Sequence, residues 1–171
     1  MSVHSYMRLR CPLEEAMARY GEWIGAPEVD KPRLVRERDA IDLASPDEEW
    51  LGLAVFIYAS GEWTVFEELS GGLETRPVDG WLALAQGGDL VYAAYNDAEH
   101  YAQLTVIEQG RLVRQFLQDE QDSTADVDVG LLPEEAKQRF KDWIHVMGWA
   151  EKDADKRERP AQGWLWIHRS D

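Results

Sequence analysis

The chain has 171 residues, of which 44% are hydrophobic, enough to build one domain with a substantial core. Its 33 acidic and 18 basic residues give a formal net charge of -15, which argues against binding nucleic acids or anionic membranes, because like charges repel. The single cysteine, Cys11, cannot form an internal disulfide, and neither a signal peptide nor an apolar stretch of the roughly 20 residues needed for a membrane span is found. We therefore expect residues 1–171 to form a single globular, cytoplasmic domain.

The first fifty residues predict one helix followed mostly by loop. Residues 12–24 read as the helix, because Pro12 suits a first turn and apolar residues recur at helical spacing after it. Residues 25–50 are polar and contain three prolines, which favours loop. Within that loop, residues 33–38 are expected to form a short edge strand.

The centre of the chain predicts an antiparallel sheet. One hairpin has its turn at Ser60-Gly61 and another at Gln109-Gly110. In the second hairpin Ala102, Leu104 and Val106 alternate with polar residues, which predicts one inward and one outward face. The expected strands cover residues 53–59, 62–66, 90–95, 101–108 and 111–117, and a short helix is expected at residues 81–85.

The last third of the chain predicts a loop, a helix, a linker and a strand. Residues 118–130 are rich in aspartate and read as an acidic loop, and Pro133 suits the first turn of a helix. Residues 151–160 are almost wholly charged and read as an exposed linker, whereas residues 164–168 predict a terminal strand that docks on the domain. The predicted fold is α+β, with a central antiparallel sheet of about five to six strands and helices packed on one face.

The sequence contains no recognisable catalytic motif. Cys11 has no local signature of a reactive thiol, and no Gly-x-Ser-x-Gly run occurs. Asp122, Asp126 and Asp128 provide the carboxylates that a hard cation prefers, but their spacing does not match a calcium-binding EF-hand loop. We therefore predict a protein that is not an enzyme, with no catalytic residue, no metal and no cofactor.

The negative charge is concentrated in the middle of the chain. Residues 51–130 contain 14 acidic and 3 basic residues. This charge favours either a solvated surface that prevents aggregation or a patch that attracts a basic protein. The predicted partner-binding residues are outward carboxylates and two exposed tyrosines: Glu67, Glu68, Tyr95, Asp97, Glu99, Tyr101, Asp119, Glu120 and Asp122.

Several stretches between Gly61 and Trp149 resemble those of bacterial immunity proteins. They are residues 61–67, 81–85, 95–97, 106–114 and 142–144. In these features the chain resembles immunity partners of polymorphic or type VI secreted toxins, over about half of its length. The resemblance implies a small acidic protein that occludes a toxin made by the same cell, and a carboxylate-rich patch would speed its encounter with a basic toxin.

Two alternatives remain beside this hypothesis. One is a metal-dependent hydrolase that uses Asp122, Asp126 and Asp128. The other is an acidic mimic of nucleic acid that blocks a DNA-binding protein. The sequence leaves the identity of the partner and the oligomeric state open.

Overall fold

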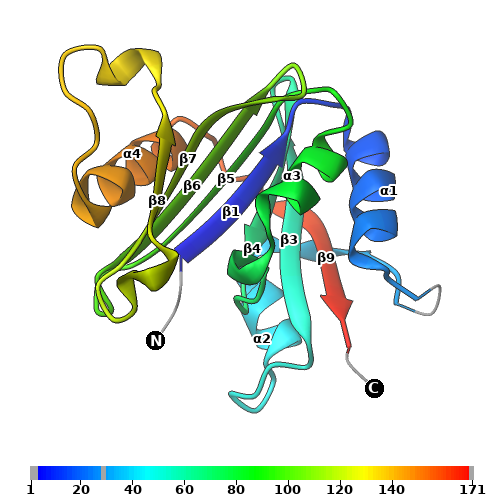
Figure 1. Cartoon of the computed structure of the whole chain (residues 1–171). Coiled ribbons are helices and arrows are strands. Elements are labelled where there is room, and N and C mark those ends of the chain that lie inside the picture. The colour runs from blue at the N-terminus through cyan, green and yellow to red at the C-terminus, as the bar shows by residue number, and fades with distance from the viewer. Residues whose placement is uncertain (1–3, 28–29, 170–171) are drawn as a thin grey trace.

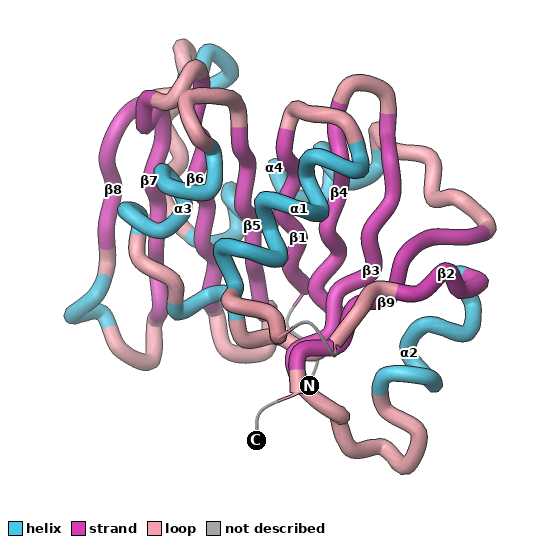
Figure 2. The backbone as a smooth tube through the Cα atoms, turned by 90° about the vertical axis from the view of Figure 1, so that its right-hand side faces the viewer, coloured by secondary structure: helices cyan, strands magenta, loops and turns pink. Residues whose placement is uncertain are grey.

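The computed structural model describes residues 4–27 and 30–169, and over these residues it contains one nine-stranded sheet in which every neighbouring pair is antiparallel. The strand order is β2-β9-β3-β4-β1-β5-β6-β7-β8, so β2 and β8 form opposite edges (Figure 2). The strands are β1 (His4–Leu9), β2 (Arg33–Arg36), β3 (Leu53–Ser60), β4 (Trp63–Glu68), β5 (Leu90–Asn96), β6 (Tyr101–Glu108), β7 (Arg111–Asp119), β8 (Val127–Gly130) and β9 (Gln162–His168).

The sheet is larger than the five to six strands that we predicted. β1 was not predicted, although it lies at the centre of the sheet and pairs with both β4 and β5. β8 falls within the segment that we interpreted as an acidic loop, and it extends the sheet beyond β7. The predicted terminal strand is confirmed as β9, which inserts between β2 and β3. The α+β class is confirmed.

Helices cover both faces of the sheet, which corrects the prediction that they would pack on one face. Helices α1 (Leu13–Ile24) and α3 (Val78–Ala85) lie on one face, and α4 (Trp143–Asp155) lies on the other (Figures 1 and 2). The short helix α2 (Ala40–Ala44), which was not predicted, lies on the same face as α4. Within the described ranges, every helix is too short or too polar to serve as a membrane span.

Each face of the sheet has its own hydrophobic core. Under α1 and α3, the buried Trp81 ring stacks on Tyr92 with a centroid distance of 4.3 Å. Under α4, Leu104 and Phe116 pack against Val146. Because both faces are covered, Thr105, which we predicted to point outward, is also buried. The alternating side chains of β6 therefore point to two faces of the sheet that are both covered by helices.

The last long helix begins ten residues later than predicted. Pro133 starts only a 3₁₀ turn, Pro133–Glu135, and the chain then continues without regular structure to Asp142. Asp142 caps α4, because its carboxylate accepts hydrogen bonds from the backbone N–H groups of Ile144 and His145. The helix then continues to Asp155, so the first half of the expected linker is helical.

Candidate functional site

Two turns lie side by side at the end of the sheet where β5 meets β6 and where β7 ends. The backbone N–H of Glu120 donates to the carbonyl of His100 at 3.3 Å, and Tyr101 pairs with Asp119 across the strands. Residues 97–100 and 119–126 contain no lysine or arginine. They contain six acidic residues, which we call the acidic end: Asp97, Glu99, Asp119, Glu120, Asp122 and Asp126.

The N-terminus of α4 is tied to the acidic end. The His100 ring stacks on Trp143 with centroids 5.0 Å apart and planes 9° apart. Glu120 accepts from the indole N–H of Trp143 at 3.1 Å, and its other carboxylate oxygen lies 2.7 Å from Nδ1 of His100. Because Ile144 is exposed on the same first turn of α4, apolar surface lies next to the carboxylates.

Several carboxylates of the acidic end also fix the conformation of their own loop. Asp122 accepts from both the backbone N–H and the hydroxyl of Thr124, and these hydrogen bonds lower the pKa of Asp122. Asp126 accepts from the backbone N–H of Asp119 at 3.0 Å, and Asp119 accepts from that of Gln121 at 2.9 Å. The charges are therefore held in a defined arrangement.

Five of the nine predicted partner-binding residues lie at the acidic end, but the two glutamates of β4 do not. Glu68 is buried on the α1 face, where it accepts from Ser5 and from the backbone N–H of Leu73, and burial raises its pKa. Its prediction as an outward carboxylate was wrong. Glu67 points to the opposite face and is paired with Tyr58 and Arg159.

The two predicted tyrosine anchors are not free surface groups. Tyr95 is half-buried and stacks on His4 with a centroid distance of 5.2 Å. Tyr101 packs against the core under α3, and its hydroxyl donates to Gln103 at 2.6 Å. Sequence reasoning did not single out His100 or Ile144 as site residues. The helix was expected to begin at Pro133, so Ile144 was not recognised as part of its first turn. The signal that could have placed Ile144 is Asp142, a good N-cap residue.

The three aspartates of the hydrolase alternative are engaged with different protein groups. Asp122 and Asp126 accept the backbone hydrogen bonds described above, and Asp128 pairs with Arg114 and Arg139. Burial acts to raise the pKa of Asp128, but the hydrogen bonds from Arg139 and Arg114 outweigh it and the pKa is lowered. Among residues 4–27 and 30–169, no group of three His, Cys, Asp or Glu side chains is placed to hold a metal ion.

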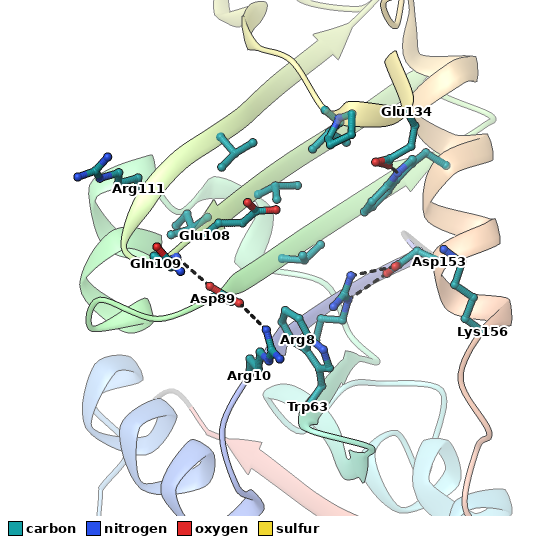
Figure 3. A pocket seen from close by; sticks show the side chains of 17 residues that line it. Arg8, Arg10, Trp63, Asp89, Glu108, Gln109, Arg111, Glu134, Asp153 and Lys156 are labelled. Carbon is teal, nitrogen blue, oxygen red and sulfur yellow. Dashed lines mark hydrogen bonds and ion pairs between the residues drawn. The ribbon is translucent and has the colours of Figure 1, made fainter. Parts of the chain in front are cut away.

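A groove with a volume of about 790 Å³ lies beside α4 over β1 and β5 to β7 (Figure 3). Arg8 lies 4.0 Å from the ring centroid of Trp63 and donates two hydrogen bonds to Asp153, at 2.9 and 3.2 Å. Arg10 bridges Asp89 and Glu62. These charged groups are therefore engaged with one another beside the Trp63 ring, at one end of the groove.

Comparisons of the chain with protein-family models, with curated proteins and with solved structures find no significant match. The resemblance to immunity proteins therefore stays a prediction. Any proposal about function has to be argued from the arrangement of charge, aromatic rings and exposed apolar groups in this molecule.

Proposed function

We propose that this protein binds a basic protein toxin through the acidic end and neutralises it in the cytoplasm of the cell that makes it. The observation that carries the proposal is the meeting of two turns that hold six carboxylates and no lysine or arginine. Such a concentration of one sign of charge accelerates the encounter with an oppositely charged partner.

The local contacts make this surface suitable for a lasting complex as well as for steering. Among the described residues, the carboxylates of Asp97 and Glu99 have no hydrogen bond or ion pair, so both are available to a partner. Ile144 supplies an exposed apolar side chain, and the stacked pair of His100 and Trp143 gives a rigid base. Interfaces are commonly dominated by a few apolar or aromatic contacts surrounded by polar groups.

The proposal is tested by isolating the partner and measuring its toxicity. The tagged protein is used to capture binding proteins from the cell that produces it, and each captured protein is then expressed alone in a sensitive host. We expect a basic protein that stops growth alone and is harmless when the wild-type protein is co-expressed. A captured DNA-binding protein without toxicity would support the mimic of nucleic acid instead.

A pair of matched variants assigns the interaction to the acidic end. The double variant Asp97→Lys/Glu99→Lys reverses two exposed charges there, and Asp47→Lys/Glu49→Lys makes the same charge change in the exposed loop after α2. Association of the purified toxin should slow about tenfold or more at low salt for the first variant only. Equal rates for the two variants, or an acidic partner, would refute the proposal.

A further inference from the structure

Exposed apolar side chains gather at the opposite edge of the sheet, far from the acidic end. Of the eight exposed large apolar residues among the described residues, five come from β2, α2 and the loop that follows. Isolated exposed apolar residues are ordinary, whereas a group of them is typical of a binding surface. We call these five residues together with β2 the β2 edge: Leu34, Ile41, Leu43, Trp50 and Leu51.

The backbone of β2 is open on its outer side. Within residues 4–27 and 30–169, β2 is the last strand of the sheet and pairs with β9 only, so no described strand lies on its other side (Figure 2). Two hollows border the strand, with volumes of about 330 and 350 Å³. Leu43 lines both hollows, Leu51 lines the first and Leu34 the second. The edge therefore combines unpaired main-chain groups with apolar hollows beside them.

The strand β2 and the residues that flank it are basic, although the whole chain has a net charge of -15. Residues 31–38 contain four basic residues and one acidic residue. The first hollow is lined by three cations and one carboxylate, namely Lys31, Arg33, Arg169 and Asp30. The second is lined by Arg33, Arg36 and Asp39, and Arg36 pairs with Asp39 at 2.7 Å, so both hollows keep an excess of positive charge. A partner that fits this edge would bring negative charge to these cations and apolar groups to the hollows.

We propose that the β2 edge docks an extended, acidic segment of another protein as an added strand of the sheet. Main-chain hydrogen bonds to β2 would supply affinity, as in other complexes formed by strand addition. Because side chains alternate along a strand, the apolar residues of the segment would face Leu43 and Leu51 on the α2 side of the sheet, and the carboxylates between them would meet Arg36 on the other side. Arg33 faces the α2 side and lines the first hollow, where its charge would attract the acidic segment as a whole. This surface is separate from the acidic end and does not depend on the toxin-binding proposal.

The charges of β2 disfavour a second copy of this chain as the occupant. Antiparallel pairing of two β2 strands over their four residues would set Arg33 opposite Arg36 of the other copy, and like charges opposite each other are destabilising. The other edge, β8, is partly covered, because Arg139 donates to the carbonyl and the carboxylate of Asp128. Charged residues on a short edge strand also serve to prevent aggregation, but that role does not need five exposed apolar neighbours.

The test uses a blocked hexapeptide of alternating valine and glutamate as the probe, with backbone amide NMR spectra of the full chain. We expect saturable shifts confined to β2, α2 and residues 45–51. The double variant Arg33→Glu/Arg36→Glu should weaken binding about tenfold or more, and the charge-matched Arg111→Glu/Lys137→Glu, at exposed positions elsewhere, should change it by less than about twofold. The variant Asp97→Lys/Glu99→Lys should leave the peptide affinity unchanged. A failure of peptide binding at the β2 edge is therefore distinguishable from a failure of the toxin-binding proposal.

Three outcomes would overturn the inference. The first is the absence of saturable shifts up to about 1 mM peptide, since that limits any binding to negligible affinity. The second is equal binding of a peptide in which lysine replaces glutamate, because this would remove the role of charge. The third is a concentration-dependent shift of the same amides without peptide, which would show that a second copy covers the edge.

Discussion

The acidic end and the β2 edge lie at opposite sides of one sheet and are built in different ways. The acidic end is fixed by carboxylates that accept hydrogen bonds. Further back along β7, a buried ion pair joins this strand to the segment before α4. The β2 edge is held by close packing of small residues: Ala40, Ala44 and Gly163 are all buried. The difference indicates that the acidic end owes its shape to those carboxylates that find donors, whereas apolar packing at the β2 edge leaves hollows that a partner can fill.

The buried ion pair between Arg114 and Glu135 is fully satisfied. Arg114 is completely buried and donates to both carboxylate oxygens of Glu135, at 2.8 and 2.9 Å, and to Asp128 at 2.7 Å. Glu135 also accepts from the backbone N–H groups of Leu132 and Phe140. Burial acts to raise the pKa of Glu135, but these donors outweigh it and the pKa is lowered. Glu135 therefore organises the segment between β8 and α4.

The largest effect is expected from Glu135→Ala, which would leave Arg114 buried with only Asp128 as an ionic partner. Removing one partner of a buried pair typically lowers the free energy of unfolding by about 3–5 kcal/mol. Urea unfolding followed by tryptophan fluorescence measures this loss. The double variant Arg114→Met/Glu135→Leu should recover most of it, since it leaves no buried charge unpaired. A loss below about 1 kcal/mol in the single variant would show that the pair does not hold this region.

The next effect tests the packing behind the β2 edge. In Gly163→Ala, the added Cβ would lie 2.5 Å from Cζ of Phe56 and 2.8 Å from the carbonyl oxygen of Ile57. Such overpacking costs about 1–3 kcal/mol and should displace β9 together with β2. The matched change Gly148→Ala in α4 meets nothing within 4 Å and should raise stability by about 0.5–1 kcal/mol, because alanine favours helix. Thermal unfolding of the two variants should therefore shift in opposite directions.

The sequence predicted the parts of this molecule that depend on neighbouring residues. The hairpins β3–β4 and β6–β7 follow from alternation and turn residues, and the structure confirms both pairings. β1 was missed because it is six residues long and includes Arg8, whose charge is balanced by Asp153 from α4. That pairing joins residues 145 positions apart, and short-range patterns cannot indicate it.

In the candidate site, too, the features that depend on neighbouring residues could be predicted and those that depend on distant residues could not. Five of the six carboxylates at the acidic end were among the predicted residues, because they lie in or beside polar turns between strands. Glu68 could not be distinguished from Glu67 by its neighbours in the sequence, since only the strand register decides which of the two faces the covered core. The β2 edge was predicted as a strand, but its exposed apolar group depends on α2, which lies in a segment interpreted as loop.

A smaller effect is expected from pH, through His168 at the end of β9. Burial lowers the pKa of His168 from 6.5 to about 4, and its Nε2 is hydrogen-bonded to the hydroxyl of Tyr20 at 2.9 Å. Because the unfolded chain binds the proton more tightly, this contribution to stability is complete above pH 6.5 and is lost as the pH falls towards 4. The loss should be roughly 1–2 kcal/mol, since the imidazole is partly solvated.

Two measurements isolate this contribution from that of other groups. NMR titration of the His168 ring should give a pKa well below its ordinary value. The variant His168→Gln keeps a side chain that can hydrogen-bond to Tyr20 but cannot bind the proton, so its stability should vary less than that of the wild-type protein between pH 4 and 6.5. Parallel curves for the two proteins would contradict the assignment.

The smallest effect concerns Asp142, a carboxylate next to the acidic end that has a structural role. Its side chain caps α4, so Asp142→Ala should lower the free energy of unfolding by about 0.5–2 kcal/mol, whereas Asp142→Asn keeps the acceptor and should cost little. Both variants remove the same negative charge, so they should slow association with the toxin equally if Asp142 contributes only to the electrostatic attraction. A slower association of the alanine variant alone would show that the first turn of α4, with Ile144, is part of the contact surface.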